Sequence, residues 1–249
     1  MNKLFSILVL FMLTAFALPV QKKTTVYLIG DSTISIKEKS AYPETGWGMP
    51  FAGFFDSTVV VDNRAKNGRS TRTFREEGLW QPVVDQLKEG DYVLIQFGHN
   101  DEVETKKSYT TKEQFTANLE RYVAETRAKK ALPILITPAA RRKFDAAGKV
   151  IGTHDVYAAI VRSVAQKQQV PLIDLDVKSQ ALIQQLGVDA SKLLFNHLQP
   201  GEHPNYPEGK IDDTHFSELG ARKMAQLVLA GLKENGVALA ERVVKPAKK

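Results

Sequence analysis

The sequence predicts an α/β fold with a parallel sheet, and two features of its hydrophobic pattern support this. Five short apolar runs show no alternation with polar residues, which is typical of strands covered on both faces. Between most of these runs, apolar residues recur at spacings of three and four, which is typical of amphipathic helices. Strands and helices that alternate along the chain in this way favour a doubly wound domain.

The predicted strands are residues 26–29, 59–61, 92–97, 133–137 and 170–175, in chain order. The predicted helices are residues 111–130, 154–169, 176–186 and 217–235. The first of these helices carries an apolar stripe made of Phe115, Leu119, Tyr122 and Val123. Ligands of open parallel sheets bind beyond the carboxyl ends of the strands, so the segments that follow strands are where we expect a site.

The length and composition of the chain suit one globular domain. It has 249 residues, of which 43% are hydrophobic and 25% charged. It has no cysteine, which excludes a disulfide scaffold, thiol catalysis and thiolate metal sites. The formal net charge of +6 either favours a polyanionic substrate, such as a uronic-acid polymer, or only aids solubility. The sequence contains no nucleic-acid-binding motif, so we expect no nucleic-acid partner.

The first twenty residues have the pattern of a secretory signal peptide. Lys3 provides a basic start, residues 4–18 are apolar, and Ala15-Phe16-Ala17 matches an A-x-A cleavage pattern. The apolar stretch is shorter than the roughly 20 residues that a transmembrane helix needs, although an uncleaved membrane anchor stays open as the alternative. We therefore expect residues 1–20 to be a leader and residues 21–249 to form a single domain with a short basic tail. The mature protein is expected to be exported, periplasmic or secreted, and free of the membrane.

A candidate nucleophile and its base lie far apart in the sequence. Ser32 follows the first predicted strand, within Gly30-Asp31-Ser32-Thr33. A serine at a strand end is more often a turn former or a helix cap, so this position alone predicts little. Asp212 and His215 precede the last predicted helix, and their spacing puts both side chains on one short loop. There the carboxylate can orient the imidazole as the general base that activates a serine.

Two further segments offer hydrogen-bond donors for an oxyanion. Gly68 lies in the segment after the second strand, where the absence of a Cβ lets the backbone approach a reacting carbonyl. Asn100 follows the third strand and carries a side-chain amide donor. Each position alone is equally typical of a turn. Four such segments in this order, three of them at predicted strand ends, predict an acyl-transfer hydrolase whose site is assembled at one edge of the sheet.

At these segments the chain resembles the SGNH (GDSL-type) hydrolases, and it is most similar to the rhamnogalacturonan acetylesterases among them. The resemblance runs from about Thr25 to Gly231. The matching segments are Gly30-Asp31-Ser32-Thr33, Gly46-Trp47-Gly48, residues 63–71 with Asn67-Gly68-Arg69-Ser70 at their centre, Phe97-Gly98-His99-Asn100-Asp101 and Asp212-Asp213-Thr214-His215-Phe216. The resemblance implies the SGNH hydrolase fold, a flavodoxin-like three-layer α/β/α sandwich with a five-stranded parallel sheet.

The same resemblance implies a serine esterase that uses no metal or cofactor. Ser32, Asp212 and His215 are then the catalytic residues. The oxyanion is held by the amides of Ser32 and Gly68 and by the side chain of Asn100. The implied reaction removes O-acetyl groups from rhamnogalacturonan, a pectic polysaccharide, through an acetyl-enzyme intermediate.

Four residues are expected to contact the substrate: Trp47, Arg69, His99 and Arg141. Trp47, together with Tyr42, is expected to form a wall on which a sugar stacks. The basic residues expected to line the cleft and meet uronate carboxylates are Arg69, Arg72, Arg141, Arg142 and Lys143. The loop at residues 196–210 carries two histidines but matches no zinc pattern, so we expect it to cover the substrate.

Other functions stay open at this point. One is a different SGNH activity, such as a lipase, a thioesterase or a xylan acetylesterase. Another is a catalytically silent carbohydrate-binding protein on the same fold, which the retention of every candidate catalytic side chain disfavours. A glycosidase is less favoured still, because it requires two opposed carboxylates instead of a serine and a histidine. The oligomeric state does not follow from the sequence.

Overall fold

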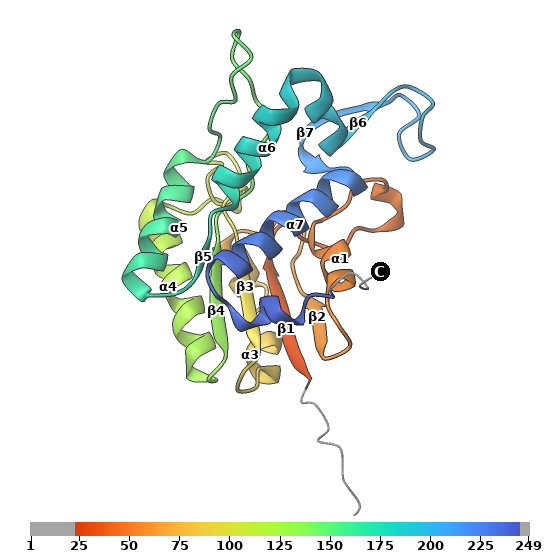
Figure 1. The fold of residues 1–249 in the computed structure, drawn as a ribbon. Coiled ribbons are helices and arrows are strands. Elements are labelled where there is room, and N and C mark those ends of the chain that lie inside the picture. Colours follow the sequence, from red (N-terminus) through yellow and green to blue (C-terminus); the bar gives the residue numbers. More distant parts are fainter. Residues whose placement is uncertain (1–22, 245–249) are drawn as a thin grey trace, which may run out of the picture.

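The computed structural model describes residues 23–244, and a five-stranded parallel sheet lies at its centre (Figure 1). The strands are β1 (Thr24–Gly30), β2 (Val59–Asn63), β3 (Tyr92–Gln96), β4 (Leu132–Ile136) and β5 (Leu172–Ile173). Their order in the sheet is β2-β1-β3-β4-β5, and each neighbouring pair is parallel. This is the flavodoxin-like order, in which the switch in strand order lies between β1 and β3.

Seven α-helices and four 3₁₀-helices are present in residues 23–244. The α-helices are α1 (Gly48–Phe51), α2 (Thr71–Glu76), α3 (Gln81–Gln86), α4 (Lys112–Ala128), α5 (Asp155–Gln168), α6 (Leu175–Ala190) and α7 (Glu218–Glu234). The 3₁₀-helices are η1 (Lys39–Ala41), η2 (Ala52–Phe54), η3 (Ser191–Leu194) and η4 (Ala238–Arg242). A second, two-stranded antiparallel sheet is formed by β6 (Phe195–Leu198) and β7 (Lys210–Phe216). In this part of the chain, no helix combines the length and the apolar character that crossing a bilayer requires.

Helices cover both faces of the main sheet, so the protein has two hydrophobic cores. Successive side chains of a strand point to opposite faces, which is why Leu28 and Ile29 of β1 lie in different cores. The core that contains Ile29 is completed by α2, α3, α4 and α5, and the core that contains Leu28 by α1, α6 and α7. Each fully buried Leu or Ile side chain contributes roughly 1.5–3 kcal/mol to this packing. The predicted three-layer α/β/α fold is confirmed.

The last predicted strand is shorter than expected, because its end belongs to a helix. The sequence predicted residues 170–175, but β5 contains only Leu172 and Ile173. Asp174 instead caps α6, since its Oδ1 accepts a hydrogen bond from the backbone N–H of Val177 at 3.3 Å. Leu175 is therefore already helical. The short helices α1 to α3 and the β6–β7 hairpin were not predicted, because their elements are too short to show a clear hydrophobic period.

The predicted leader and most of the predicted basic tail lie outside residues 23–244. The leader, residues 1–20, and the division of the chain at residue 21 therefore stay predictions, and so does the tail at 243–249.

Candidate active site

The three segments that follow β1, β2 and β3 meet at the carboxyl edge of the sheet. The end of β1 requires a glycine, because a Cβ on Gly30 would lie 2.3 Å from the carbonyl oxygen of Gln96 on β3. The chain then turns at Asp31 and presents Ser32 at this edge. Asp31 Oδ1 holds the turn by accepting hydrogen bonds from the backbone N–H of Thr33 at 2.9 Å and from its hydroxyl at 2.8 Å. The turn that carries Ser32 is therefore fixed by buried contacts.

The structure brings Ser32, His215 and Asp212 into one hydrogen-bonded chain. Ser32 Oγ lies 3.0 Å from His215 Nε2, and His215 Nδ1 lies 2.9 Å from Asp212 Oδ2. A carboxylate only accepts hydrogen bonds, so the proton of a neutral imidazole sits on Nδ1, and Nε2 is free to accept from the serine hydroxyl. This arrangement allows His215 to act as a general base toward Ser32.

Asp212 remains ionised at the pH at which such a base works. Burial alone would raise its pKa, but hydrogen bonds from the side chain and backbone of His215 hold the pKa of Asp212 well below its usual value. The carboxylate is therefore available to orient the imidazole and to stabilise the imidazolium that forms when His215 takes a proton. Loss of activity at acid pH is then expected from protonation of His215 and not from that of Asp212.

Asp212 and His215 lie on β7 and not on the loop that the sequence predicted. In a regular strand, residues three apart point to opposite faces. Here the pairing of β6 with β7 shifts between Phe195, which faces Phe216, and Asn196, which faces Asp212. The three intervening residues of β7 bulge out, and Asp212 Oδ1 accepts hydrogen bonds from the backbone N–H groups of Thr214 at 2.8 Å and His215 at 2.9 Å. The bulge turns both side chains toward each other.

The two expected oxyanion donors belong to neighbouring loops that are tied together. Asn100 Nδ2 donates to the backbone carbonyl of Arg69 at 3.1 Å, so its amide lies beside the Gly68 segment. Gly68 has a φ of +76°, in the region that favours glycine. Asp101 holds the two loops in register, since its Oδ1 accepts from the backbone N–H of Thr71 at 2.9 Å and from its hydroxyl at 2.6 Å. The roles of Gly68 and Asn100 in catalysis stay predictions.

Two of the expected substrate contacts are wrong because the side chains are buried. Trp47 is 0% exposed, and its Nε1 donates to Gln96 Oε1 at 2.8 Å. It packs in the core against Phe51 and has no free face for a sugar. His99 is 3% exposed, and its ring packs edge-on against the ring of His154 with 4.3 Å between the centroids. A substrate cannot reach either ring.

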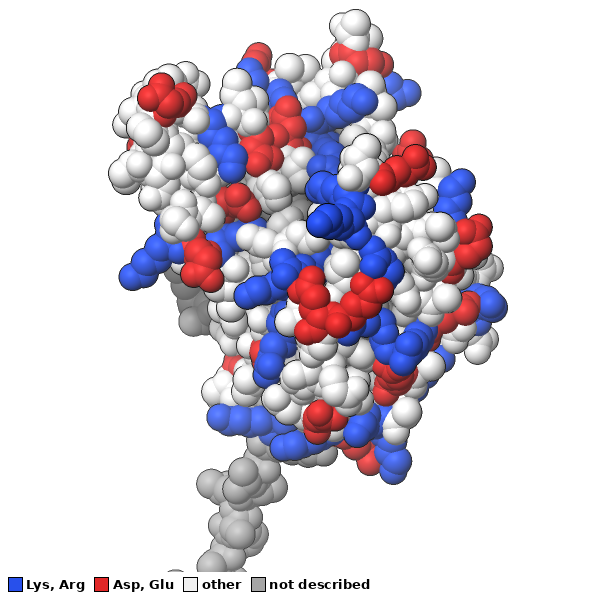
Figure 2. Space-filling model, turned by 180° about the vertical axis from the view of Figure 1, so that it is seen from behind, with Lys and Arg blue, Asp and Glu red and all other residues white. Residues whose placement is uncertain are grey.

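The basic residues near the site mostly serve internal ion pairs. Arg142 donates to Asp213 Oδ1 at 2.9 Å, and Arg69 pairs with Glu77 at 2.7 Å. Arg141 contacts the strand that carries the candidate base, because its guanidinium donates to Oγ1 of Thr214, the residue before His215, at 2.7 Å. Figure 2 shows basic and acidic side chains interspersed over one face of the molecule. Arg69 and Arg141 stay predicted substrate contacts, while the pairing of Arg142 already satisfies its charge.

Three charged residues that could not be predicted from the sequence lie behind the candidate base His215. Lys37 and Glu44 form an ion pair at 2.7 Å in the segment between β1 and α1, and Lys210 lies 3.4 Å from both Glu44 Oε2 and Asp212 Oδ2. No local motif marks them, since their contacts arise only in the folded chain. Glu44, Asp212 and His215 also offer ligand atoms within 4.8 Å of one another. The ammonium groups of Lys37 and Lys210 already neutralise these two carboxylates, so the cluster is better described as an ion-pair network than as a cation site.

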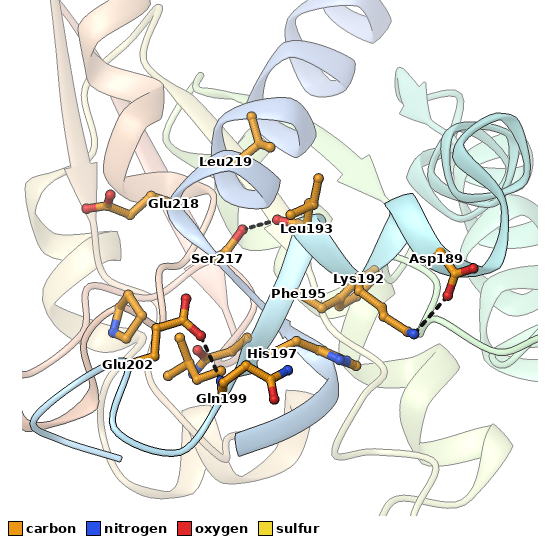
Figure 3. A pocket seen from close by; sticks show the side chains of 13 residues that line it. Asp189, Lys192, Leu193, Phe195, His197, Gln199, Glu202, Ser217, Glu218 and Leu219 are labelled. Carbon is orange, nitrogen blue, oxygen red and sulfur yellow. Dashed lines mark hydrogen bonds and ion pairs between the residues drawn. The ribbon is translucent and has the colours of Figure 1, made fainter. Parts of the chain in front are cut away.

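A hollow of about 590 Å³ lies against β6 and the start of α7 (Figure 3). Leu193, Phe195 and Leu219 form apolar parts of its wall, and Ser217 donates to the backbone carbonyl of Leu193 at 2.6 Å. None of its lining residues belongs to the Ser32–His215–Asp212 chain.

Comparison with protein families gives one match that covers most of the chain. Residues 28–223 match the GDSL-like Lipase/Acylhydrolase family. The matched range contains Ser32, Gly68, Asn100 and both Asp212 and His215.

Two similar proteins come from Bacillus subtilis (strain 168). Rhamnogalacturonan acetylesterase RhgT is 42% identical over 225 residues, which cover 90% of this chain and 96% of that protein. Probable rhamnogalacturonan acetylesterase YesY is 36% identical, over 88% of this chain and 97% of that protein.

Solved structures share the fold. Protein YXIM of Bacillus subtilis superposes with a TM-score of 0.75 at 28% identity, over 87% of this chain. This chain spans only 58% of the length of that structure. Axe2, an acetylxylan esterase from Geobacillus stearothermophilus, superposes with a TM-score of 0.63 at 19% identity, over 89% of this chain and 98% of that one. At that identity the likeness concerns the fold alone.

Proposed function

Because the chain belongs to the GDSL-like Lipase/Acylhydrolase family and is a carboxylic ester hydrolase, we propose that it removes O-acetyl groups from rhamnogalacturonan. The observation that carries this proposal is the hydrogen-bonded chain from Ser32 through His215 to Asp212, in a protein 42% identical to a rhamnogalacturonan acetylesterase over most of its length. The predicted pectic substrate agrees with this similarity.

The geometry supports a two-step acyl transfer. Ser32 Oγ attacks the acetyl carbonyl carbon while its proton passes to His215 Nε2. His215 then returns this proton to the leaving sugar oxygen, and the sugar hydroxyl departs from an acetyl-serine. In the second step, a water loses a proton to His215 and attacks the acetyl group. His215 returns this proton to Ser32 Oγ as the bond between the acetyl carbon and Oγ breaks, so acetate and free Ser32 are the products.

The negative oxygen of each tetrahedral intermediate needs donors. We assign these to the backbone amides of Ser32 and Gly68 and to Asn100 Nδ2. Lys106 supports this assignment, since its ammonium donates to Asn100 Oδ1 at 3.2 Å. That contact polarises the side-chain amide. One N–H of its NH₂ group donates to the carbonyl of Arg69, and the second N–H is the donor that we assign to the oxyanion.

The substitution Asn100→Ala is expected to lower kcat by roughly 10²–10³, as for the loss of one oxyanion donor. KM should change little, because the donor acts mainly on charge that develops in the transition state. Steady-state kinetics on p-nitrophenyl acetate measure both constants. An unchanged kcat in a folded variant removes Asn100 from the oxyanion site.

Acetate release from several acetylated polymers tests the substrate. The purified protein is compared on acetylated rhamnogalacturonan, acetylated homogalacturonan, acetylated xylan and a short acyl ester at equal acetyl concentration. We expect the highest kcat/KM on rhamnogalacturonan. A higher value on xylan would contradict the proposed substrate, although the esterase activity would stand.

We further propose that the protein is exported and that residues 1–20 are removed. The basic start, the apolar stretch and the Ala15-Phe16-Ala17 pattern support this proposal. N-terminal sequencing of the protein recovered from the periplasm or the medium should begin near residue 21. Recovery of the intact chain from the cytoplasm would contradict it.

A further inference from the structure

Lys37 is a charged residue in a place where the chain would be expected to bury an apolar one. The preceding residue, Ile36, is 62% exposed, whereas the Lys37 side chain is 0% exposed. An ammonium taken out of water costs several kcal/mol unless its partners compensate. The segment between β1 and α1 thus exposes an apolar side chain and encloses a charge. Such an inversion points to a specific role for the charge.

Every donor of the Lys37 ammonium has a partner in the candidate active site. Lys37 Nζ donates to the backbone carbonyl of Ser32 and, at 3.0 Å, to Asn67 Oδ1. Its third partner is Glu44 Oε1, at 2.7 Å. An ammonium has three N–H donors, so its capacity is filled. Ser32 carries the candidate nucleophile, and Asn67 directly precedes Gly68, so one buried charge joins the nucleophile turn to the oxyanion loop.

Glu44 continues this connection toward the base. Its second oxygen, Oε2, lies 3.4 Å from Lys210 Nζ, and the same nitrogen lies 3.4 Å from Asp212 Oδ2. Asp212 then contacts His215, which contacts Ser32. Positive and negative groups alternate along this series, from Lys37 to Asp212. Both ends of the series lead to Ser32, because Lys37 contacts its carbonyl and Asp212 reaches its hydroxyl through His215.

The titration behaviour of the pair agrees with this geometry. Burial lowers the pKa of Lys37, and the Glu44 carboxylate opposes that effect. Burial alone would raise the pKa of Glu44, but the charges of His215 and Lys37 hold the pKa below its usual value. Glu44 is therefore ionised, and it attracts the imidazolium that His215 becomes during the reaction.

We propose that Lys37 and Glu44 are positioning residues of the esterase reaction. Lys37 fixes the Ser32 turn against the Gly68 loop, and Glu44 places a negative charge behind His215. This inference rests on the esterase function but not on the identity of the polysaccharide.

The test replaces each charge by a neutral group of similar shape, in Lys37→Met and Glu44→Gln. Both variants should keep the fold, and kcat on p-nitrophenyl acetate should fall by roughly 10- to 100-fold. KM should stay within about threefold of the parent value, because positioning acts on the reacting atoms more than on binding.

The pH profile of kcat/KM separates this role from a structural one. The titratable groups that interact with His215 are Asp31, Glu44, His99 and Asp212. Lys37 and Lys210 act on it through the carboxylates that they contact. Glu44→Gln removes a negative charge and leaves the charges of Lys37 and Lys210 unbalanced, so the His215 imidazolium becomes less stable. The acid limb of the profile, where kcat/KM falls as His215 takes up a proton, therefore moves to lower pH. Lys37→Met leaves Glu44 less neutralised, so the acid limb moves to higher pH. Each shift should be about half a pH unit or more, and the double variant should return close to the parent limb.

Asp176→Asn is the matched control, because it also removes a buried acid from an ion pair. Asp176 pairs with Arg162 at 2.8 Å and contacts none of the candidate catalytic residues. This variant should be less stable to heat, with parent kcat and an unmoved acid limb.

Several outcomes would overturn the proposal. A kcat equal to that of the parent in both folded variants would do so. Equal losses of kcat in the two variants, without a shift of the acid limb, would also do so. If Lys37→Met does not fold, Glu44→Gln still decides through the direction of its acid-limb shift. A parent protein without activity on p-nitrophenyl acetate contradicts the esterase function itself, and the proposal falls with it.

Discussion

Replacement of Ser32 by alanine is expected to abolish ester hydrolysis. Without Oγ no acetyl-serine forms, and in serine hydrolases the loss of the nucleophile lowers kcat by about 10⁶. The variant should fold normally, because within residues 23–244 the Ser32 hydroxyl makes no hydrogen bond other than the one to His215. Acetate release and thermal unfolding, measured on the same preparation, check both parts of this expectation.

Ser179→Ala is a suitable control for that experiment. Ser179 is also buried, but its hydroxyl accepts a hydrogen bond from the backbone N–H of Ala140 at 2.8 Å, away from the catalytic groups. Its removal should cost about 1–3 kcal/mol of stability by leaving a buried N–H without a partner, with kcat unchanged. Full activity of Ser32→Ala would refute the nucleophile assignment, and with it the two-step mechanism.

The substitution Asp212→Asn is expected to give the second largest loss, roughly 10⁴ in kcat near neutral pH. An asparagine side chain can donate a hydrogen bond to the imidazole, and this favours the tautomer whose proton sits on Nε2. That tautomer cannot accept the proton of Ser32. KM should change much less than kcat, and steady-state kinetics on p-nitrophenyl acetate separate the two.

The adjacent acid provides the control for Asp212. Asp213 lies on the same strand but pairs with Arg142 at 2.9 Å and with His197 Nε2 at 2.8 Å. Asp213→Asn should therefore lower stability and leave kcat within a small factor of the parent. If Asp213→Asn loses the activity and Asp212→Asn keeps it, the orienting carboxylate has been assigned to the wrong residue.

The sheet could be predicted from the sequence, and so could the edge at which the candidate site lies. Both predictions use patterns among residues that are close together in the sequence. Unbroken apolar runs mark strands that are covered on both faces, and parallel strands deliver their following residues to one edge. Ser32, Gly68 and Asn100 could be placed there without coordinates. The spacing of Asp212 and His215 likewise indicated a pair, although not the strand bulge that joins them.

Substrate contacts were harder to predict because residue type does not determine burial. Trp47 and His99 have side chains that suit sugar recognition, but they lie in the core and under the site. An indole fits a hydrophobic core as well as it fits a sugar. Only the packing of the layers around each ring distinguishes the two.

For this protein, the order of apolar runs and polar segments was sufficient to predict the α/β fold and to select Ser32 and His215 as the candidate nucleophile and base. The fold alone decided that Lys37, seven residues before Glu44, faces inward and joins the Ser32 turn, the Gly68 loop and Asp212. Periodicity reports contacts between residues near in sequence, whereas a buried ion pair depends on which distant segments supply its partners and exclude water. Those partners exist only after the sheet, the β7 bulge and the segment between β1 and α1 have packed together.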